Sequence, residues 1–157
     1  MIIDVREIPA TGKHFCGVAS SAILEVDSED IEVTDDLRYE LVAHVISGRL
    51  IVKGSLGLKL RFRCSRCAEF YDAYVEEKAF FCDREVTKEN ESVDLTADMR
   101  EAILLAFPAY PVCAPGCKGL CAQCGANLNI SSCSCSRPDD RQWNALDGLN
   151  GFTSLKR

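Results

Sequence analysis

The first half of the chain alternates short apolar stretches with polar or glycine-bearing breaks, a pattern typical of β-strands. These stretches occupy residues 18–26, 37–46, 50–53 and 56–63. In the last stretch Leu58, Leu60 and Phe62 alternate with charged residues, which indicates one apolar face and one solvent-facing face. Because half-buried strands of this kind belong to antiparallel sheets, the pattern predicts a twisted antiparallel β-sheet, with barrel-like closure as one option.

A further strand pattern runs from Phe70 to Phe81, shortly after the sequence Cys64-Ser-Arg-Cys67. Two apolar stretches joined by a short polar connection predict a hairpin that carries the cysteine pair at its tip. Residues 83–92 are polar and charged, so they predict a surface loop.

Helical periodicity begins after Asp94, a residue suited to cap a helix, and ends before Pro108. Its apolar positions share one side of the helix: Met99, Ala102, Ile103 and Ala106. Such a stripe predicts that one helix packs on the sheet and closes the core. A second short helix is predicted from residue 139 or 140 to residue 149, with apolar positions at Trp143, Leu146 and Leu149.

The chain contains ten cysteines, at positions 16, 64, 67, 82, 113, 117, 121, 124, 133 and 135. A chain of 157 residues can build a core without disulfides, and its amino-terminal sequence lacks the layout of a signal peptide. We therefore expect a cytoplasmic protein, in which closely paired cysteines bind metal more often than they form disulfides. Residues 111–135 carry six cysteines and few large apolar side chains, so this segment needs such a cross-link to hold its shape.

Zinc prefers four ligands in a tetrahedron, commonly supplied as two close pairs. One candidate site consists of Cys121, Cys124, Cys133 and Cys135, and a second would join the hairpin tip to the segment after the helix through Cys64, Cys67, Cys113 and Cys117. We favour two zinc ions, and a single site made from Cys64, Cys67, Cys121 and Cys124 is the alternative. Cys16 and Cys82 are predicted to be small buried residues outside the sites.

A zinc ion with four thiolate ligands has no open position for water, so such sites are structural. His14 and His44 do not lie near a nucleophile motif, and the sequence has no glycine-rich phosphate loop, metalloprotease motif or serine elbow. We therefore predict that the protein is not an enzyme.

Charge is unevenly distributed along the chain, which has 18 basic and 24 acidic residues and a net charge of −6. Residues 49–66 include six basic residues and no acid, whereas residues 25–40 carry eight acids. The basic residues could form a ridge that contacts phosphate, with Lys59, Arg61, Arg63, Arg66 and Lys118 as the candidate RNA contacts. The alternative is a solvated face whose basic residues pair with acids on neighbouring strands.

The sequence Cys117-Lys-Gly-Leu-Cys121-Ala-Gln-Cys124-Gly-Ala-Asn-Leu-Asn129, followed by Cys133-Ser-Cys135, resembles the signature of the YceD-like family, described as large ribosomal RNA subunit accumulation proteins. Cys64-Ser-Arg-Cys67, the helix after Asp94 and a terminal Trp143-x-x-Leu146 also match, whereas Ala122 stands where the family often has proline. The resemblance implies a bacterial or organellar factor that supports accumulation of large-subunit (23S) ribosomal RNA.

These observations predict an α+β fold with one or two packed helices, divided into a sheet-plus-helix domain over residues 1–110 and a zinc ribbon-like cysteine module over residues 111–150. The hypothesis is a non-catalytic ribosome-biogenesis factor that binds ribosomal RNA or a large-subunit assembly intermediate, with no membrane or small-molecule partner. Two alternatives stay open. One is an interaction module for a basic ribosomal protein that never touches RNA, and the other is a thiol redox sensor.

Overall fold

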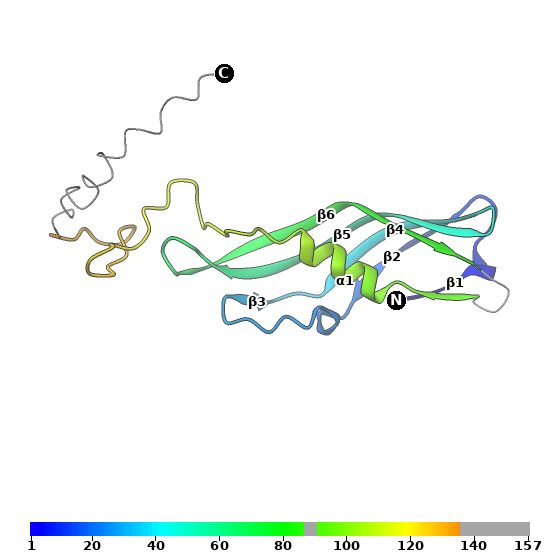
Figure 1. Ribbon diagram of the computed structural model, residues 1–157, viewed down its shortest axis with the longest axis horizontal. Coiled ribbons are helices and arrows are strands. Elements are labelled where there is room, and N and C mark those ends of the chain that lie inside the picture. Colours follow the sequence, from blue (N-terminus) through cyan, green and yellow to red (C-terminus); the bar gives the residue numbers. More distant parts are fainter. Residues whose placement is uncertain (87–90, 136–157) are drawn as a thin grey trace, which may run out of the picture.

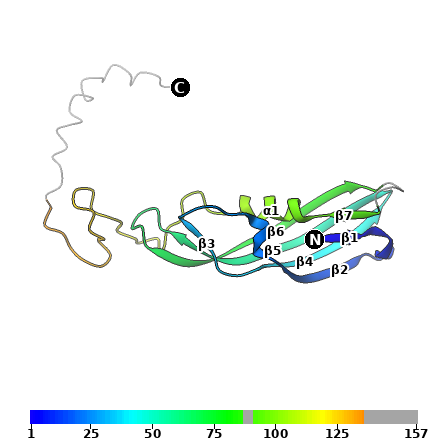
Figure 2. The ribbon, with the colours of Figure 1, turned by 90° about the horizontal axis from the view of Figure 1, so that it is seen from below.

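The computed structural model describes residues 1–86 and 91–135. It confirms the α+β class, with one α-helix, two short 3₁₀ turns and seven strands in these residues (Figures 1 and 2). The elements in chain order are β1 (Ile2–Asp4), η1 (Val5–Glu7), β2 (Lys13–Ala19), η2 (Ser21–Leu24), β3 (Ile31–Val33), β4 (Leu37–Ile46), β5 (Arg49–Arg63), β6 (Phe70–Glu85), β7 (Ser92–Asp94) and α1 (Thr96–Leu105).

The main sheet is antiparallel and is built around the long strand β5. One edge of β5 pairs with β6 along most of its length, and the other edge pairs first with β4 and then with β3. β2 pairs with the free edge of β4. Within the described residues β2, β3 and β6 each pair with one strand only and not with one another, so the sheet is open and the barrel-like option is wrong.

β5 is one continuous strand, although its sequence predicts two. The break in the pattern falls at Gly54, where a Cβ atom would lie 2.0 Å from the carbonyl oxygen of Glu40 on β4. At the same place β6 contains one extra residue, since Leu56 pairs with Glu77 and Gly54 pairs with Phe80. This bulge changes which β6 residues face the core, because an inserted residue reverses the alternation of the strand.

The core lies on one face of the sheet. β4 and β5 contribute most of its large buried side chains, namely Leu37, Leu41, Leu50, Val52, Leu56, Leu58, Leu60 and Phe62. The helix α1 crosses this face and buries Met99 and Ile103, while η2 adds Leu24 and the small β1–β7 ladder adds Ile3 and Val93 (Figure 2). The opposite face of the sheet carries the charged positions predicted from the alternation.

The predicted N-cap at Asp94 is wrong by one residue, because Leu95 holds that position and makes no side-chain cap, although Asp94 still contacts the start of the helix. The Asp94 carboxylate accepts hydrogen bonds from the Thr96 backbone N–H at 2.9 Å and from the Thr96 hydroxyl at 2.6 Å, just before the first turn of α1. The helix ends at Leu105, two residues before the predicted end, and the chain then continues toward the hairpin tip (Figure 1).

Two predicted strand limits are wrong. The strand predicted over residues 18–26 starts earlier and ends at Ala19, where Ser20 caps the turn η2 by accepting from the Ala22 N–H. β6 extends to Glu85, so the loop after it starts later than predicted, and the β1–β7 ladder was not predicted. The predicted second helix lies outside the described residues. Among the residues described, no helix is both long and apolar enough to cross a membrane.

Candidate metal centres

The first cluster joins two segments that are distant in the sequence. Cys64 and Cys67 lie in the turn between β5 and β6, and Cys113 and Cys117 lie in the extended segment after α1. Their four sulfur atoms all lie within 4.8 Å of one another. The Sγ atoms of Cys64 and Cys117 are 3.9 Å apart, and those of Cys67 and Cys113 are 3.7 Å apart.

The second cluster is local. Cys121, Cys124, Cys133 and Cys135 bring their sulfur atoms within 4.8 Å of one another. The structure therefore groups the eight cysteines as predicted for two sites. It does not bring Cys64 and Cys67 together with Cys121 and Cys124, as the single-site alternative would require.

The spacing of the sulfur atoms fits a tetrahedral metal ion. Zn–S bonds of about 2.3 Å give sulfur–sulfur edges of about 3.8 Å in a tetrahedron, whereas a disulfide brings its sulfurs to about 2 Å. The two distances in the first cluster agree with the former value, and all ten cysteines are free thiols. Each cluster therefore offers four sulfur ligands that could hold one metal ion.

Both clusters contain the same backbone turn. In the first, the Ala68 N–H donates to the Cys64 carbonyl at 2.9 Å, and in the second the Gly125 N–H donates to the Cys121 carbonyl at 2.9 Å. Ala68 and Gly125 each follow the second cysteine of a Cys-x-x-Cys pair and have positive φ angles of 60° and 72°. This conformation suits glycine and strains alanine, so Ala68 shows that the fold around the first cluster imposes the turn.

Backbone N–H groups favour the ionised form of one thiol in each cluster. Partial burial opposes ionisation of Cys64, but N–H groups of Cys113, Cys67 and Arg66 lower its pKa to about 6. For Cys121, the N–H groups of Cys124 and Gln123 lower the pKa to about 6.

Other thiols in the clusters resist ionisation. Burial and hydrogen bonding with neighbouring sulfurs raise the pKa of Cys113 to about 12, and the hydrogen bond with Cys124 raises that of Cys135 to about 12. Four crowded sulfurs can ionise together only if a cation compensates their charge, so metal binding at neutral pH would release protons.

Asn129 lies in the segment of the second cluster, and its side chain contacts a ligand of the first cluster. This residue was not singled out from the sequence. Its side-chain amide donates to the Cys117 sulfur at 3.3 Å and lowers the pKa of that thiol, while its side-chain oxygen accepts from the Lys118 N–H at 2.8 Å. Such groups behind the ligands orient them and tune metal affinity. The Asn127 side-chain oxygen accepts hydrogen bonds from the backbone N–H and the side-chain amide of Asn129. The spacing of these two asparagines is the one feature of the sequence that indicates this role.

The first cluster is better shielded than the second. Cys64, Cys67 and Cys117 are buried and pack against Tyr71 and Val112. In the second cluster two cysteines are half-buried and two are exposed. A metal ion would therefore be more accessible to chelators in the second cluster.

The two remaining cysteines lie apart from both clusters. Cys82 is buried in the core on β6, as predicted, and burial raises its pKa. Cys16 lies exposed on β2, so its predicted burial is wrong.

Three arginines of the predicted basic ridge, all on β5, are paired with acids. Arg61 contacts Glu32 on β3 at 2.6 Å, and Arg63 contacts Asp30 at 3.2 Å. At the other end of β5, Arg49 is held by Asp83 on β6 at 2.9 Å. These pairs match the alternative reading of a solvated face with cross-strand ion pairs.

The other candidate RNA contacts have different surroundings. Arg66 donates to the carbonyl oxygens of Pro115 and Cys117, so it ties the hairpin tip to the cysteine segment. Lys59 makes no ion pair within residues 1–86 and 91–135. Lys118 is exposed between the clusters.

The fold and the clusters define a class of protein: an open antiparallel sheet extended by a cysteine-rich segment with two tetrahedral ligand sets. Residues 76–150 match the family model described as "Large ribosomal RNA subunit accumulation protein YceD". Over this segment, about half of its length, the chain is similar to the YceD family.

Two plant proteins of the same description are similar to this chain. The chain is 39% identical over 61 residues to "Large ribosomal RNA subunit accumulation protein YCED homolog 1, chloroplastic" of Zea mays, which is 38% of this chain and 21% of that protein. The protein of the same name from Arabidopsis thaliana is 34% identical over 62 residues, 39% of this chain and 19% of its own length.

A bacterial relative covers more of the chain. An uncharacterized protein of Mycobacterium tuberculosis is 32% identical over 107 residues, 59% of this chain and 50% of its own length. The match thus spans about a fifth of the two plant relatives and half of the mycobacterial one. No solved structure matches the chain significantly.

Proposed function

We propose that the protein is a non-catalytic ribosome-biogenesis factor that supports accumulation of large-subunit (23S) ribosomal RNA and holds two structural zinc ions. The observation that carries this proposal is the pair of four-cysteine clusters, one of them wholly within the segment that matches the YceD family. Thiolate sets of this kind suit zinc, and four protein ligands leave no position for a reacting water.

The role of the zinc ions would be to shape the cysteine segment. Few apolar side chains of residues 111–135 are buried, and its backbone hydrogen bonds are mostly local turns. The first cluster attaches the start of this segment to the hairpin tip, and the second folds the remainder. The result would be a rigid end of the molecule that a partner can recognise (Figure 1).

The test of this function is the ribosomal RNA content of cells that lack the protein. We expect the ratio of large-subunit to small-subunit ribosomal RNA to fall and to recover when the full chain is supplied. An unchanged ratio in the deletion strain would contradict the proposal.

A second candidate function, contact with a basic ribosomal protein instead of RNA, is favoured by the charges. The arginines of the ridge already pair with carboxylates, which lowers their attraction for phosphate. Eight metal-bound thiolates and two divalent ions would also change the net charge from −6 to −10. A protein this acidic is better suited to a basic polypeptide than to a nucleic acid.

Neutralising the paired arginines should distinguish contact with RNA from contact with a basic protein. We expect the double variant Arg61→Gln and Arg63→Gln to bind precursor ribosomal RNA no more weakly than the wild type in a salt titration. If these arginines contact phosphate, affinity would fall and the slope of log K against log salt would decrease by about 2. Lys59→Gln on the same strand is the matched comparison, because its ammonium group makes no ion pair in the described part of the chain.

A further inference from the structure

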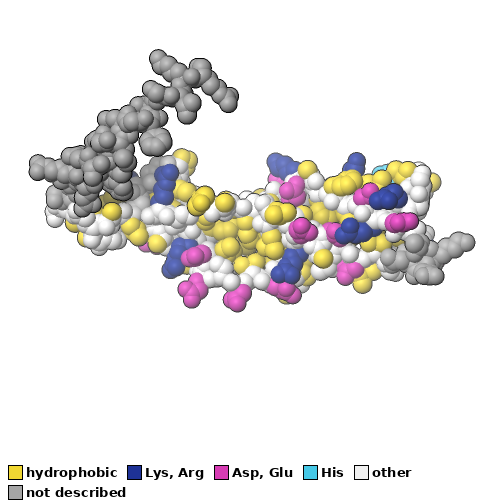
Figure 3. All heavy atoms as spheres, viewed as in Figure 1, with side chains coloured by type: hydrophobic (Ala, Val, Ile, Leu, Met, Phe, Trp, Pro, Cys, Tyr) yellow, Lys and Arg dark blue, Asp and Glu magenta, His cyan; other side chains and the backbone are white. Residues whose placement is uncertain are grey.

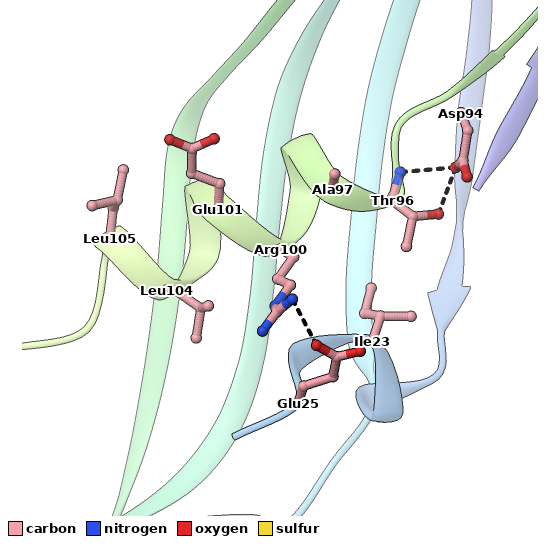
Figure 4. Close-up of a pocket in the computed structure, with 9 residues that line it drawn as sticks. All are labelled: Ile23, Glu25, Asp94, Thr96, Ala97, Arg100, Glu101, Leu104 and Leu105. Atoms are coloured by element: carbon pink, nitrogen blue, oxygen red, sulfur yellow. Dashed lines mark hydrogen bonds and ion pairs between the residues drawn. The ribbon is translucent and has the colours of Figure 1, made fainter. Parts of the chain in front are cut away.

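An open groove of about 670 Å³ runs between α1 and η2 (Figure 4). None of its lining residues belongs to either cysteine cluster. The helix forms one wall and the turn forms the other, with the start of α1 at one end, and the lining residues are Ile23, Glu25, Asp94, Thr96, Ala97, Arg100, Glu101, Leu104 and Leu105.

The groove exposes apolar side chains from the outer side of α1. The inner side of the helix buries Met99 and Ile103, while Leu104 is half-buried and Leu105 is 78% exposed. Ile23 on η2 is also half-buried, and it lies near Thr96 and Ala97 at the end of the groove away from the two leucines (Figure 4). Hydrophobic side chains gather on this face of the molecule beside the carboxyl end of α1 (Figure 3). Apolar surface rimmed by polar groups is typical of a binding site.

The rim of the groove is acidic. It carries the carboxylates of Glu25, Asp94 and Glu101, and two cations offset part of this charge: the Arg100 guanidinium, and the amino-terminal ammonium of Met1, which lies 3.3 Å from Asp94. Arg100 contacts Glu25 at 2.7 Å and donates to the Leu24 carbonyl at 3.2 Å, so its charge is used in joining α1 to η2. Glu101 is exposed and has no ion-pair partner among residues 1–86 and 91–135.

We propose that this groove binds a segment of a basic protein in which lysine or arginine residues flank an apolar side chain. The inference rests on the protein-contact mode of the proposed function and gives it a site. The apolar side chain would lie against Leu104 and Leu105, and a flanking cation would meet the carboxylate of Glu101, which is unpaired in the described part of the chain. RNA phosphates, or a second copy of this acidic chain, would bring negative charge to the same rim, so charge complementarity favours the basic segment.

Photocrosslinking in cells tests the site directly. The full chain carries p-benzoyl-phenylalanine in place of Leu105, and adducts are treated with nuclease and identified by mass spectrometry. We expect one adduct with a strongly basic protein. The matched control places the crosslinker at Ile130, which is also 78% exposed but lies outside the groove, and should not yield that adduct.

Charge reversal on the rim tests the chemistry of the partner. Glu101→Lys in the crosslinking chain should lower the yield of the adduct about tenfold, whereas Glu85→Lys on β6 should leave it unchanged. An adduct with the chain itself, an adduct with RNA, or equal yields from positions 105 and 130 would overturn the inference. A normal ribosomal RNA ratio in the deletion strain would instead refute the proposed function, whereas a lowered ratio without the basic-protein adduct overturns the groove alone.

Discussion

Replacing Cys64 by serine is expected to lower the zinc content from two ions per chain to one and to destabilise the sheet as well as the cysteine segment. Cys64 is buried in the first cluster, which joins residues 53 positions apart in the sequence. A cross-link that closes a loop of about 50 residues stabilises a fold by about 4 kcal/mol if it acts by restricting the unfolded chain. Equilibrium denaturation in zinc-containing buffer, together with metal analysis, measures both effects.

Cys133→Ser is the matched control for this prediction. It should also reduce zinc to one ion per chain, but the second cluster spans only residues 121–135 and none of its four cysteines lies on or next to a strand of the sheet. The unfolding free energy of the sheet should then change by less than about 1 kcal/mol. Equal destabilisation by both variants, or by neither, would show that the first cluster does not link the hairpin to the segment after α1.

Replacing Phe62 by alanine is expected to lower the unfolding free energy by about 3–5 kcal/mol, the usual cost of deleting a buried aromatic side chain. Phe62 lies at the end of β5, next to the first cluster, and is 1% exposed. Its ring meets Phe107 edge to face with centroids 5.5 Å apart and lies 6.4 Å from the ring of Tyr71. The Phe62 side chain thus links β5 to β6 and to the segment after α1.

Phe81→Ala provides the comparison, because Phe81 lies on β6 but is 58% exposed on the opposite face of the sheet. Its loss should cost no more than about 1 kcal/mol, the value of an exposed contact with Lys53. Similar costs for the two variants would mean that the core does not lie on the face covered by α1.

The sequence was sufficient to predict the strands with regular alternation. The limits of β4 match residues 37–46, where every second residue from Leu37 to Val45 is apolar. The strand predicted after residue 18 failed for a tertiary reason: the Ser21 N–H donates to Asp36 at 2.8 Å and Ser20 caps the turn, which stops the strand at Ala19. The continuity of β5 depends on its partners β4 and β6, which no local pattern reveals.

The grouping of the eight cysteines could also be predicted, because close pairs must share a turn and four thiolates complete a zinc site. The surroundings of these ligands could not. Asn129 reaches Cys117 only after the chain turns back at the second cluster. Arg61 and Arg63 of β5 meet acids on β3 and just before it, which lie about thirty residues away in the sequence. A prediction based only on the lack of acids between residues 49 and 66 therefore overestimates the positive charge of that face.

The most direct test of the central claim is native mass spectrometry of the full chain, purified under reducing conditions with zinc present. The account predicts two zinc ions per chain, bound with loss of thiol protons and released only on denaturation or chelation. A chain that carries no metal, or one whose cysteines are joined as disulfides, would contradict it.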